Sequence, residues 1–186
     1  MTEKRILTLW NDEGVNDNDT SVLRKKSRVL PAVLDKKARE DIQALIDSFM
    51  ELDGALGLAA PQIGISKRII VFLTKGFDEG RKVKRRNDFE VLINPRITQT
   101  DGDKVTEFEG CLSCPELQVG ISRSPIIKVR ALNEKGEKIS KRYLNYVARV
   151  VQHELDHLDG KLIVDYEGAI YYPKKKQEFY EKLFKG

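Results

Sequence analysis

One short stretch, Gln152 to His157, carries both histidines of this 186-residue chain. It reads Gln-His-Glu-Leu-Asp-His, so a helix would place His153 and His157, four positions apart, one above the other. Two imidazoles in this arrangement can bind one metal ion, and Glu154 can act on a metal-bound water without being a ligand. The flanking residues are apolar enough to bury the helix, where a metal would satisfy the imidazoles. The stretch predicts a metal-dependent hydrolase, although the same spacing also occurs in solvated helices that bind nothing.

The third metal ligand decides which kind of site this would be. A catalytic site usually has three protein ligands and one open position, and no third histidine remains in the chain. Glu178 or Glu181 would give a zinc peptidase, whereas Cys111 would give a Cys-His-His hydrolase. Cys111 and Cys114 together would instead close a structural Cys2His2 zinc site.

The spacing of the two cysteines favours the open site. If residues 111–114 are extended, the two cysteine side chains point to opposite faces, because side chains alternate along a strand. A closed site would also leave Glu154 without a role. We therefore assign Cys111 to the metal and Cys114 to packing, while the peptidase with a glutamate ligand stays an alternative.

Length and composition predict one compact domain over residues 1–186 with a core of its own, since 40% of the residues are hydrophobic. A net charge of +4 with 33% charged residues predicts a mildly basic, well-solvated surface, which alone does not argue for nucleic acid. No stretch approaches the roughly 20 apolar residues of a membrane span, and two cysteines do not make a disulfide framework. We therefore expect a cytoplasmic protein.

Periodicity and capping residues predict three helices. Asp35 is the predicted N-cap of a helix over residues 36–52. Residues 145–158 should form the metal-binding helix, and 174–185 a basic amphipathic helix that packs on the rest of the chain. Residues 11–20 are turn formers without periodicity and predict an exposed loop.

Strands are predicted wherever β-branched and apolar residues run together: 69–73, 91–93, 126–132 and 139–144. Asn94-Pro95 should end the second strand, and the basic residues 75–90 should form an exposed loop before it. The last two strands should form a hairpin that leads directly into the metal-binding helix.

A run of small residues, 54–64, contains Gln62 as its one polar side chain. Glycine and alanine allow a backbone to approach a ligand or another element closely, although tight packing of a loop explains the composition equally well. The run lacks the Lys-Ser/Thr of a P-loop and the full GxGxxG spacing, so a phosphate loop is excluded.

Together these stretches resemble the bacterial peptide deformylase family. The motif G-apolar-G-apolar-A-A-x-Q is matched by residues 55–62, except that Ala55 stands where the first glycine is usual. The motif E-G-C-apolar-S is matched by 109–113, and Q-H-E-apolar-D-H by 152–157. Cys114 departs from the aliphatic residue that is usual at its position. Three motifs in the expected order make a chance resemblance improbable.

The resemblance implies an α+β fold with antiparallel β-sheets partly wrapped around a central metal-binding HExxH helix, an N-terminal helix and a short C-terminal helix. It implies removal of the formyl group from the N-terminal formyl-methionine of newly synthesised polypeptides, with release of formate. By motif position Cys111, His153 and His157 would hold the metal and Glu154 would be the general base. The remaining catalytic groups would be two donors to the developing oxyanion, the Gln62 side chain and the Leu112 backbone N–H.

The resemblance also implies an extended peptide that pairs with the backbone beside Gly57 and the strand after Ser113, with Gly110 among the substrate-binding residues. Leu56 and Val150 would contribute to an apolar pocket for methionine, with a less certain part for Tyr146. Ferrous iron is the implied metal in the cell, with zinc, nickel or cobalt replacing it in purified protein. Contact of the basic C-terminal segment with the ribosome is a further implication, against the packing role that its composition favours. Arg149 receives no predicted role.

Overall fold

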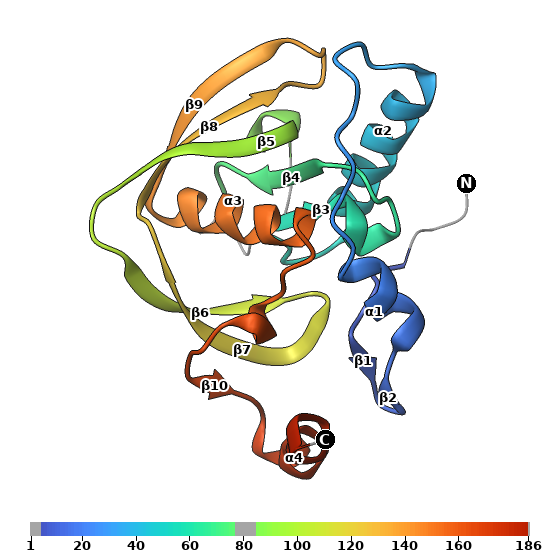
Figure 1. The fold of residues 1–186 in the computed structure, drawn as a ribbon, viewed down its shortest axis with the longest axis vertical. Helices are drawn as coiled ribbons and strands as arrows, with labels where there is room; N and C mark the ends of the chain where they lie inside the picture. Colours follow the sequence, from blue (N-terminus) through green and yellow to red (C-terminus); the bar gives the residue numbers. More distant parts are fainter. Residues whose placement is uncertain (1–4, 77–84, 186) are drawn as a thin grey trace.

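The structure is a computed structural model that describes residues 5–76 and 85–185. Its helices are α1 (Asp17–Leu23), α2 (Lys36–Glu51), α3 (Asn145–Leu158) and α4 (Gln177–Lys185), with short 3-10 turns η1 (Ala60–Ile63), η2 (Arg86–Asp88), η3 (Ile163–Asp165) and η4 (Lys174–Lys176). Figure 1 shows α3 in the middle of the molecule, with a larger sheet on one side of it and a smaller sheet on the other. This arrangement confirms the predicted α+β fold around a central helix.

The larger sheet is antiparallel and has the strand order β3-β4-β5-β8-β9. Its strands are β3 (Gly57–Ala59), β4 (Ile69–Leu73), β5 (Phe89–Asp101), β8 (Ile126–Leu132) and β9 (Lys138–Leu144). In β4, Ile69 and Val71 pack in the core beneath α2, whereas Ile70 and Phe72 pack in the core beneath α3. The strand is apolar at every position because both faces of the sheet are covered.

The smaller sheet has the order β10-β7-β6, with β6 (Val105–Cys111), β7 (Cys114–Arg123) and β10 (Ile170–Tyr171). A two-strand ribbon of β1 (Trp10–Asn11) and β2 (Gly14–Val15) lies near it. Beneath the sheet is a third apolar core, to which α1 contributes Leu23 and α4 contributes Tyr180. The C-terminal helix therefore packs on the smaller sheet, as its composition predicts.

Several predicted elements are confirmed within a residue or two. The carboxylate of Asp35 accepts a hydrogen bond from Ala38 N at 2.7 Å and caps α2, which was predicted over 36–52. The strand at 69–73 and the hairpin of β8 and β9 form as expected. Asn145 begins α3 directly after β9, so the hairpin leads into α3 without an intervening loop, as predicted.

The prediction of an exposed loop over residues 11–20 holds for the exposed turn between β1 and β2, but it was wrong where α1 begins at Asp17. Asn16 caps α1 by accepting a hydrogen bond from Asp19 N at 3.3 Å, so the polar cluster begins a helix. Asp19 is buried, and its carboxylate accepts from Thr8 N at 3.0 Å and from Arg5 at 2.6 Å. Partners outside the segment therefore stabilise a run of residues that by itself is typical of a turn.

Asn94-Pro95 does not end its strand either, because β5 continues to Asp101. The pairing of β5 with β8 shifts register between Ile93 and Arg96, and this bulge accommodates the missing N–H of Pro95. Asn94 has a φ of 52° and bonds both backbone groups of Leu30 at 2.9 Å. The bulge thus joins the sheet to the segment that precedes α2.

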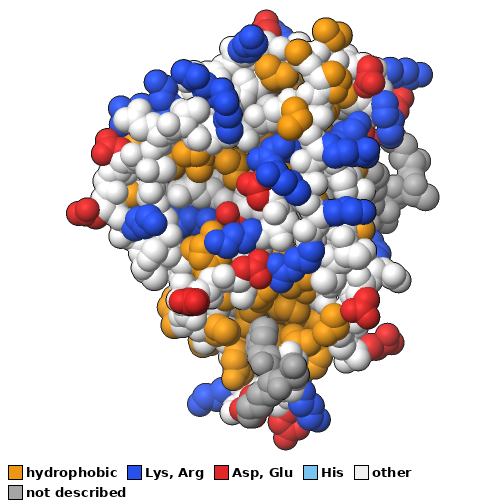
Figure 2. Space-filling view, in the orientation of Figure 1, with side chains coloured by type: hydrophobic (Ala, Val, Ile, Leu, Met, Phe, Trp, Pro, Cys, Tyr) orange, Lys and Arg blue, Asp and Glu red, His pale blue; other side chains and the backbone are white. Residues whose placement is uncertain are grey.

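The predicted loop over residues 75–90 lies only partly within the described residues, since Arg81, Lys82 and Lys84 fall outside them. Figure 2 shows lysine and arginine side chains spread over the visible face with acidic side chains among them, in agreement with the mildly basic composition. Across residues 5–76 and 85–185, every helix is too short or too polar to span a membrane.

Candidate active site

Three potential metal ligands converge between α3 and the end of β6. His153 and His157 project from α3, and the Sγ of Cys111 lies 3.3 Å from the Nε2 of His157. One ligand atom from each of the three residues lies within 4.8 Å of the others. Among the described residues, no other cluster of His, Cys, Asp and Glu side chains has the spacing of metal ligands.

Neither alternative ligand set is assembled. Cys114 is fully buried in the apolar core under the smaller sheet and does not belong to the ligand group. Glu178 and Glu181 lie on α4, which packs on that core, and they are likewise absent from the group. The geometry supports an open three-ligand site over a closed Cys2His2 site or a glutamate-liganded peptidase.

The chemistry of these donors fits a divalent transition metal. Burial alone would raise the pKa of Cys111, but a hydrogen bond from Cys114 and the charge of His157 hold that pKa well below its ordinary value. A thiolate with two imidazoles suits zinc, iron, cobalt or nickel. The buried Glu154 Oε2 is among the described polar atoms without a hydrogen-bond partner, as expected for a carboxylate oxygen that acts on a bound water.

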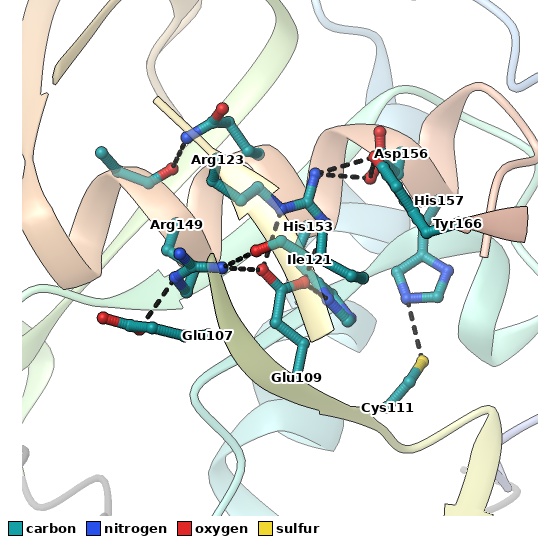
Figure 3. Close-up of polar contacts among 12 residues, drawn as sticks. Glu107, Glu109, Cys111, Ile121, Arg123, Arg149, His153, Asp156, His157 and Tyr166 are labelled. Carbon is teal, nitrogen blue, oxygen red and sulfur yellow. Dashed lines mark hydrogen bonds and ion pairs between the residues drawn. The ribbon is translucent and has the colours of Figure 1, made fainter. Parts of the chain in front are cut away.

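Glu109 is the buried centre of the contacts behind the ligands (Figure 3). Its carboxylate accepts from Arg123 at 2.8 and 2.9 Å, from Arg149 at 2.7 Å and from the Nδ1 of His153 at 3.0 Å. Burial on its own would raise the pKa of Glu109, but the hydrogen bonds from Arg123 and His153 lower it to about 2. Because its Nδ1 faces this carboxylate, His153 is left with Nε2 for a metal.

A second carboxylate of α3 extends this network. Asp156, the aspartate of the Gln-His-Glu-Leu-Asp-His motif, accepts from Arg123 at 2.7 Å and from the Tyr166 hydroxyl at 2.6 Å. Arg149 also donates to the backbone carbonyl of Ile121 at 2.9 Å. The two arginines therefore tie α3 to the smaller sheet at both ends of the motif.

The run of small residues brings β3 against Glu154. A Cβ added at Gly57 would stand 2.4 Å from the Oε1 of Glu154, so only glycine allows this approach. Burial raises the pKa of Glu154 to about 7, a value suited to proton transfer near neutral pH. The composition of this run thus reflects the close contact of β3 with α3.

Gln62 is held firmly at the other end of the run. Its Oε1 accepts from Ala59 N at 2.9 Å, and its Nε2 donates to Ser113 Oγ at 3.2 Å and lies 4.0 Å from Cys111 Sγ. Because the Oε1 of Gln62 already accepts from the backbone of Ala59, the amino group is the end of the amide that faces Cys111. A hydrogen-bond donor is therefore fixed beside the ligand group.

A pocket of about 760 Å³ opens over the ligand group. The predicted substrate residues all line it: Leu56, Gly57, Gly110 and Val150, together with Tyr146, Leu112 and Gln62. Phe108 and Tyr171 line it as well, and both were missed because an exposed aromatic on a short strand has no motif. Both sheets and α3 contribute residues to the wall of the pocket. The wall therefore combines apolar side chains with strand backbone.

Comparisons with known proteins agree with this arrangement. A family model described as polypeptide deformylase matches residues 13–170. Peptide deformylase 1 of Clostridium acetobutylicum is 43% identical over 144 residues, which cover 77% of this chain and 87% of that protein. Peptide deformylase of Pseudothermotoga lettingae is 42% identical over 144 residues, which cover 77% of this chain and 76% of that protein.

Solved structures give the same likeness. The crystal structure of peptide deformylase from Thermotoga maritima has a TM-score of 0.72 at 36% identity and covers 91% of this chain and all of that one (100%). The Met-Ala-Ser-bound structure of a class I type b peptide deformylase from Acinetobacter baumannii has a TM-score of 0.71 at 26% identity, with coverage of 88% and 99%.

We expect Glu109→Gln to weaken both the fold and the metal site. The change leaves two buried guanidinium groups without their shared counter-charge, which should cost about 3–5 kcal/mol of unfolding free energy. It also loosens His153, which should reduce zinc affinity about 10- to 100-fold. Denaturant unfolding and zinc competition with a chelator measure the two effects.

Glu107→Gln is the matched control, because Glu107 pairs with the same Arg149 at 2.9 Å but its side chain is 51% exposed. That variant should lose less than about 1 kcal/mol and keep its zinc affinity. Equal effects of the two substitutions would show that the buried carboxylate does not organise the site.

Proposed function

The chain belongs to the polypeptide deformylase family, and on this premise we propose which of its residues carry out the reaction. It is an enzyme that hydrolyses the N-formyl group of N-formylmethionyl nascent peptides and releases formate. The single observation that carries our assignment is the convergence of Cys111, His153 and His157. Cys111 and His153 line the pocket together with Glu154.

Cys111, His153 and His157 are the proposed metal ligands, and Glu109 is the residue that positions His153. A divalent ion held there supplies Lewis-acid chemistry, since it lowers the pKa of a bound water and polarises the carbonyl of the substrate. Support comes from the mutual distances of the ligand atoms and from the carboxylate bonded to His153 Nδ1.

Glu154 is the proposed general base. It takes a proton from the attacking water and passes it to the amine that departs from the formyl group. Its burial and its raised pKa suit a group that must both accept and release a proton near neutral pH. Gly57 keeps β3 close enough to shield this carboxylate from bulk water.

Gln62 and the backbone N–H of Leu112 are the proposed donors to the formyl oxygen as negative charge develops on it. The Gln62 amide is fixed by Ala59 and Ser113, so it needs no reorganisation during the reaction. Leu112 lies in the turn between β6 and β7 and lines the pocket. Each such donor typically lowers the barrier by about 3 kcal/mol.

The proposed substrate position follows the pocket wall. The peptide lies extended beside Gly57 and Gly110, where main-chain pairing is independent of the peptide sequence. Leu56 and Val150, with Tyr146, form the apolar surface for the methionine side chain. We also propose that residues 1–186 form one catalytic domain that acts in the cytoplasm, where nascent chains emerge from ribosomes.

Formate release from a formyl-Met peptide tests these roles. Glu154→Gln should reduce kcat about 10²- to 10⁴-fold with the metal retained, because proton transfer is lost. Gln62→Ala should reduce it about 10²-fold, and Cys111→Ala should lose the metal. Cys114→Ala should keep the activity and serves as the control at the neighbouring turn. Folded, metal-loaded wild type that releases no formate would refute the proposal.

Ferrous iron is the proposed native metal, with zinc, nickel or cobalt able to replace it in purified protein. A Cys-His-His set with mixed soft and borderline donors accepts all four ions. Protein loaded anaerobically with iron should lose its activity in air, whereas protein loaded with zinc should keep the activity that it has, because zinc has no redox chemistry. Loss in air at the same rate for both metals would contradict the iron assignment.

The basic C-terminal segment is a proposed ribosome contact. Tyr180 anchors α4 in the apolar core, while Lys174, Lys175 and Lys182 are exposed and can reach phosphate groups. Replacing these three lysines by glutamate should weaken co-sedimentation with ribosomes at low salt. The matched control reverses three exposed lysines elsewhere, at positions 25, 26 and 135. Equal binding by the two triple variants would remove this role.

A further inference from the structure

The two cysteines face each other across the turn that joins β6 to β7. Cys111 ends β6, Cys114 begins β7, and the two are paired in the antiparallel register with only Leu112 and Ser113 between them. The expectation of opposite faces assumed that residues 111–114 are extended, and this assumption fails because the four residues form a hairpin end. Directly opposed residues of a hairpin project to the same side of the sheet.

This pairing puts the Cα atoms of the two cysteines at a separation that a disulfide can span. Directly opposed residues in an antiparallel pair have Cα atoms about 4.5–5.5 Å apart, and disulfides span Cα distances of about 4.4–6.8 Å. The Cα pairing of Cys111 with Cys114 therefore suits a disulfide.

The two sulfurs differ in their access to solutes. Cys111 is partly exposed and lines the pocket, whereas Cys114 is fully buried (0%) among apolar neighbours such as Trp10 and Leu23. A small oxidant that enters the pocket therefore meets Cys111 first. Cys114 can react only with what forms on Cys111.

We propose that Cys114 is a resolving cysteine that captures oxidised Cys111 as a reversible disulfide. The Cys111 sulfur attacks a peroxide, whose O–O bond breaks, so that the sulfur becomes a sulfenic acid while the peroxide is reduced to hydroxide. The sulfur of Cys114 then attacks that sulfenic sulfur. The S–S bond forms, the S–O bond breaks, and the hydroxyl group leaves as water with the thiol proton of Cys114.

This inference rests on the proposed role of Cys111 as a metal ligand and adds a means of protecting it. In the disulfide, Cys111 can no longer bind the metal, so the enzyme is switched off. It is also shielded from further oxidation to sulfinic and sulfonic acids, which are irreversible. A cellular thiol that reduces the disulfide would return the ligand set intact. A cysteine that served only packing would give no such protection.

The test uses zinc-loaded full-length protein, so that the metal itself cannot be oxidised. The protein is treated with hydrogen peroxide, alkylated without reduction and digested with trypsin, which releases residues 105–123 as one peptide with both cysteines. We expect this peptide to resist alkylation and to be two hydrogens lighter than the dithiol form. Zinc should be released in parallel and bound again after dithiothreitol is added with zinc.

Cys114→Ala and Cys114→Val are the comparison variants, and zinc content with circular dichroism checks that each is folded. In both, Cys111 should proceed to the sulfinic and sulfonic acids, and dithiothreitol should no longer restore zinc binding. If wild-type Cys111 reaches these acids as fast as in the variants, without a disulfide, the proposal is overturned. Peptide mass and zinc content are read without substrate, so this result stays separate from any failure of the deformylase assignment.

Discussion

The buried carboxylate of Glu109 is the interaction on which the rest of the site depends. Glu109 belongs to β6, whereas the groups that donate to it come from Arg123 on β7 and from Arg149 and His153 on α3. A carboxylate taken out of water is costly unless its oxygens are filled by donors. The two strands and the helix must therefore pack in the one arrangement that gives both oxygens of Glu109 their donors. That arrangement also places Cys111, two residues along β6, opposite His157.

Local patterns predicted the helix and brought His153 and His157 together as proposed ligands, because their spacing has meaning within a single turn of helix. Arg149 could not be interpreted in the same way, since its buried partner Glu109 lies 40 residues away in the sequence. Nothing in either segment alone states that a guanidinium and a carboxylate will be desolvated together. The family motifs include Glu109, but its role as the centre of a buried network became visible only in three dimensions.

The two wrong element predictions have one cause in common. The side chains of Asn16 and Asn94 are typical of turns, and both predictions used them as such. In the structure Asn16 caps α1, and Asn94 bonds the backbone of Leu30, far away in the sequence. An asparagine satisfies whichever backbone groups the fold presents to it. An asparagine in the sequence therefore predicts an irregular backbone, but it does not predict whether the helix or strand ends at that residue.

The spacing of the two cysteines shows how strongly one turn controls chemistry. In an extended strand the pair would diverge, whereas in a closed zinc site both sulfurs would have to reach the imidazoles. The two-residue turn of Leu112 and Ser113 gives neither result, because it directs Cys111 to His157 and leaves Cys114 behind it in the apolar core. The same turn presents Leu112 to the pocket and holds Gln62 through Ser113. A single hairpin end thus determines the position of the proposed ligand Cys111, the position of a proposed donor and the environment of the second thiol.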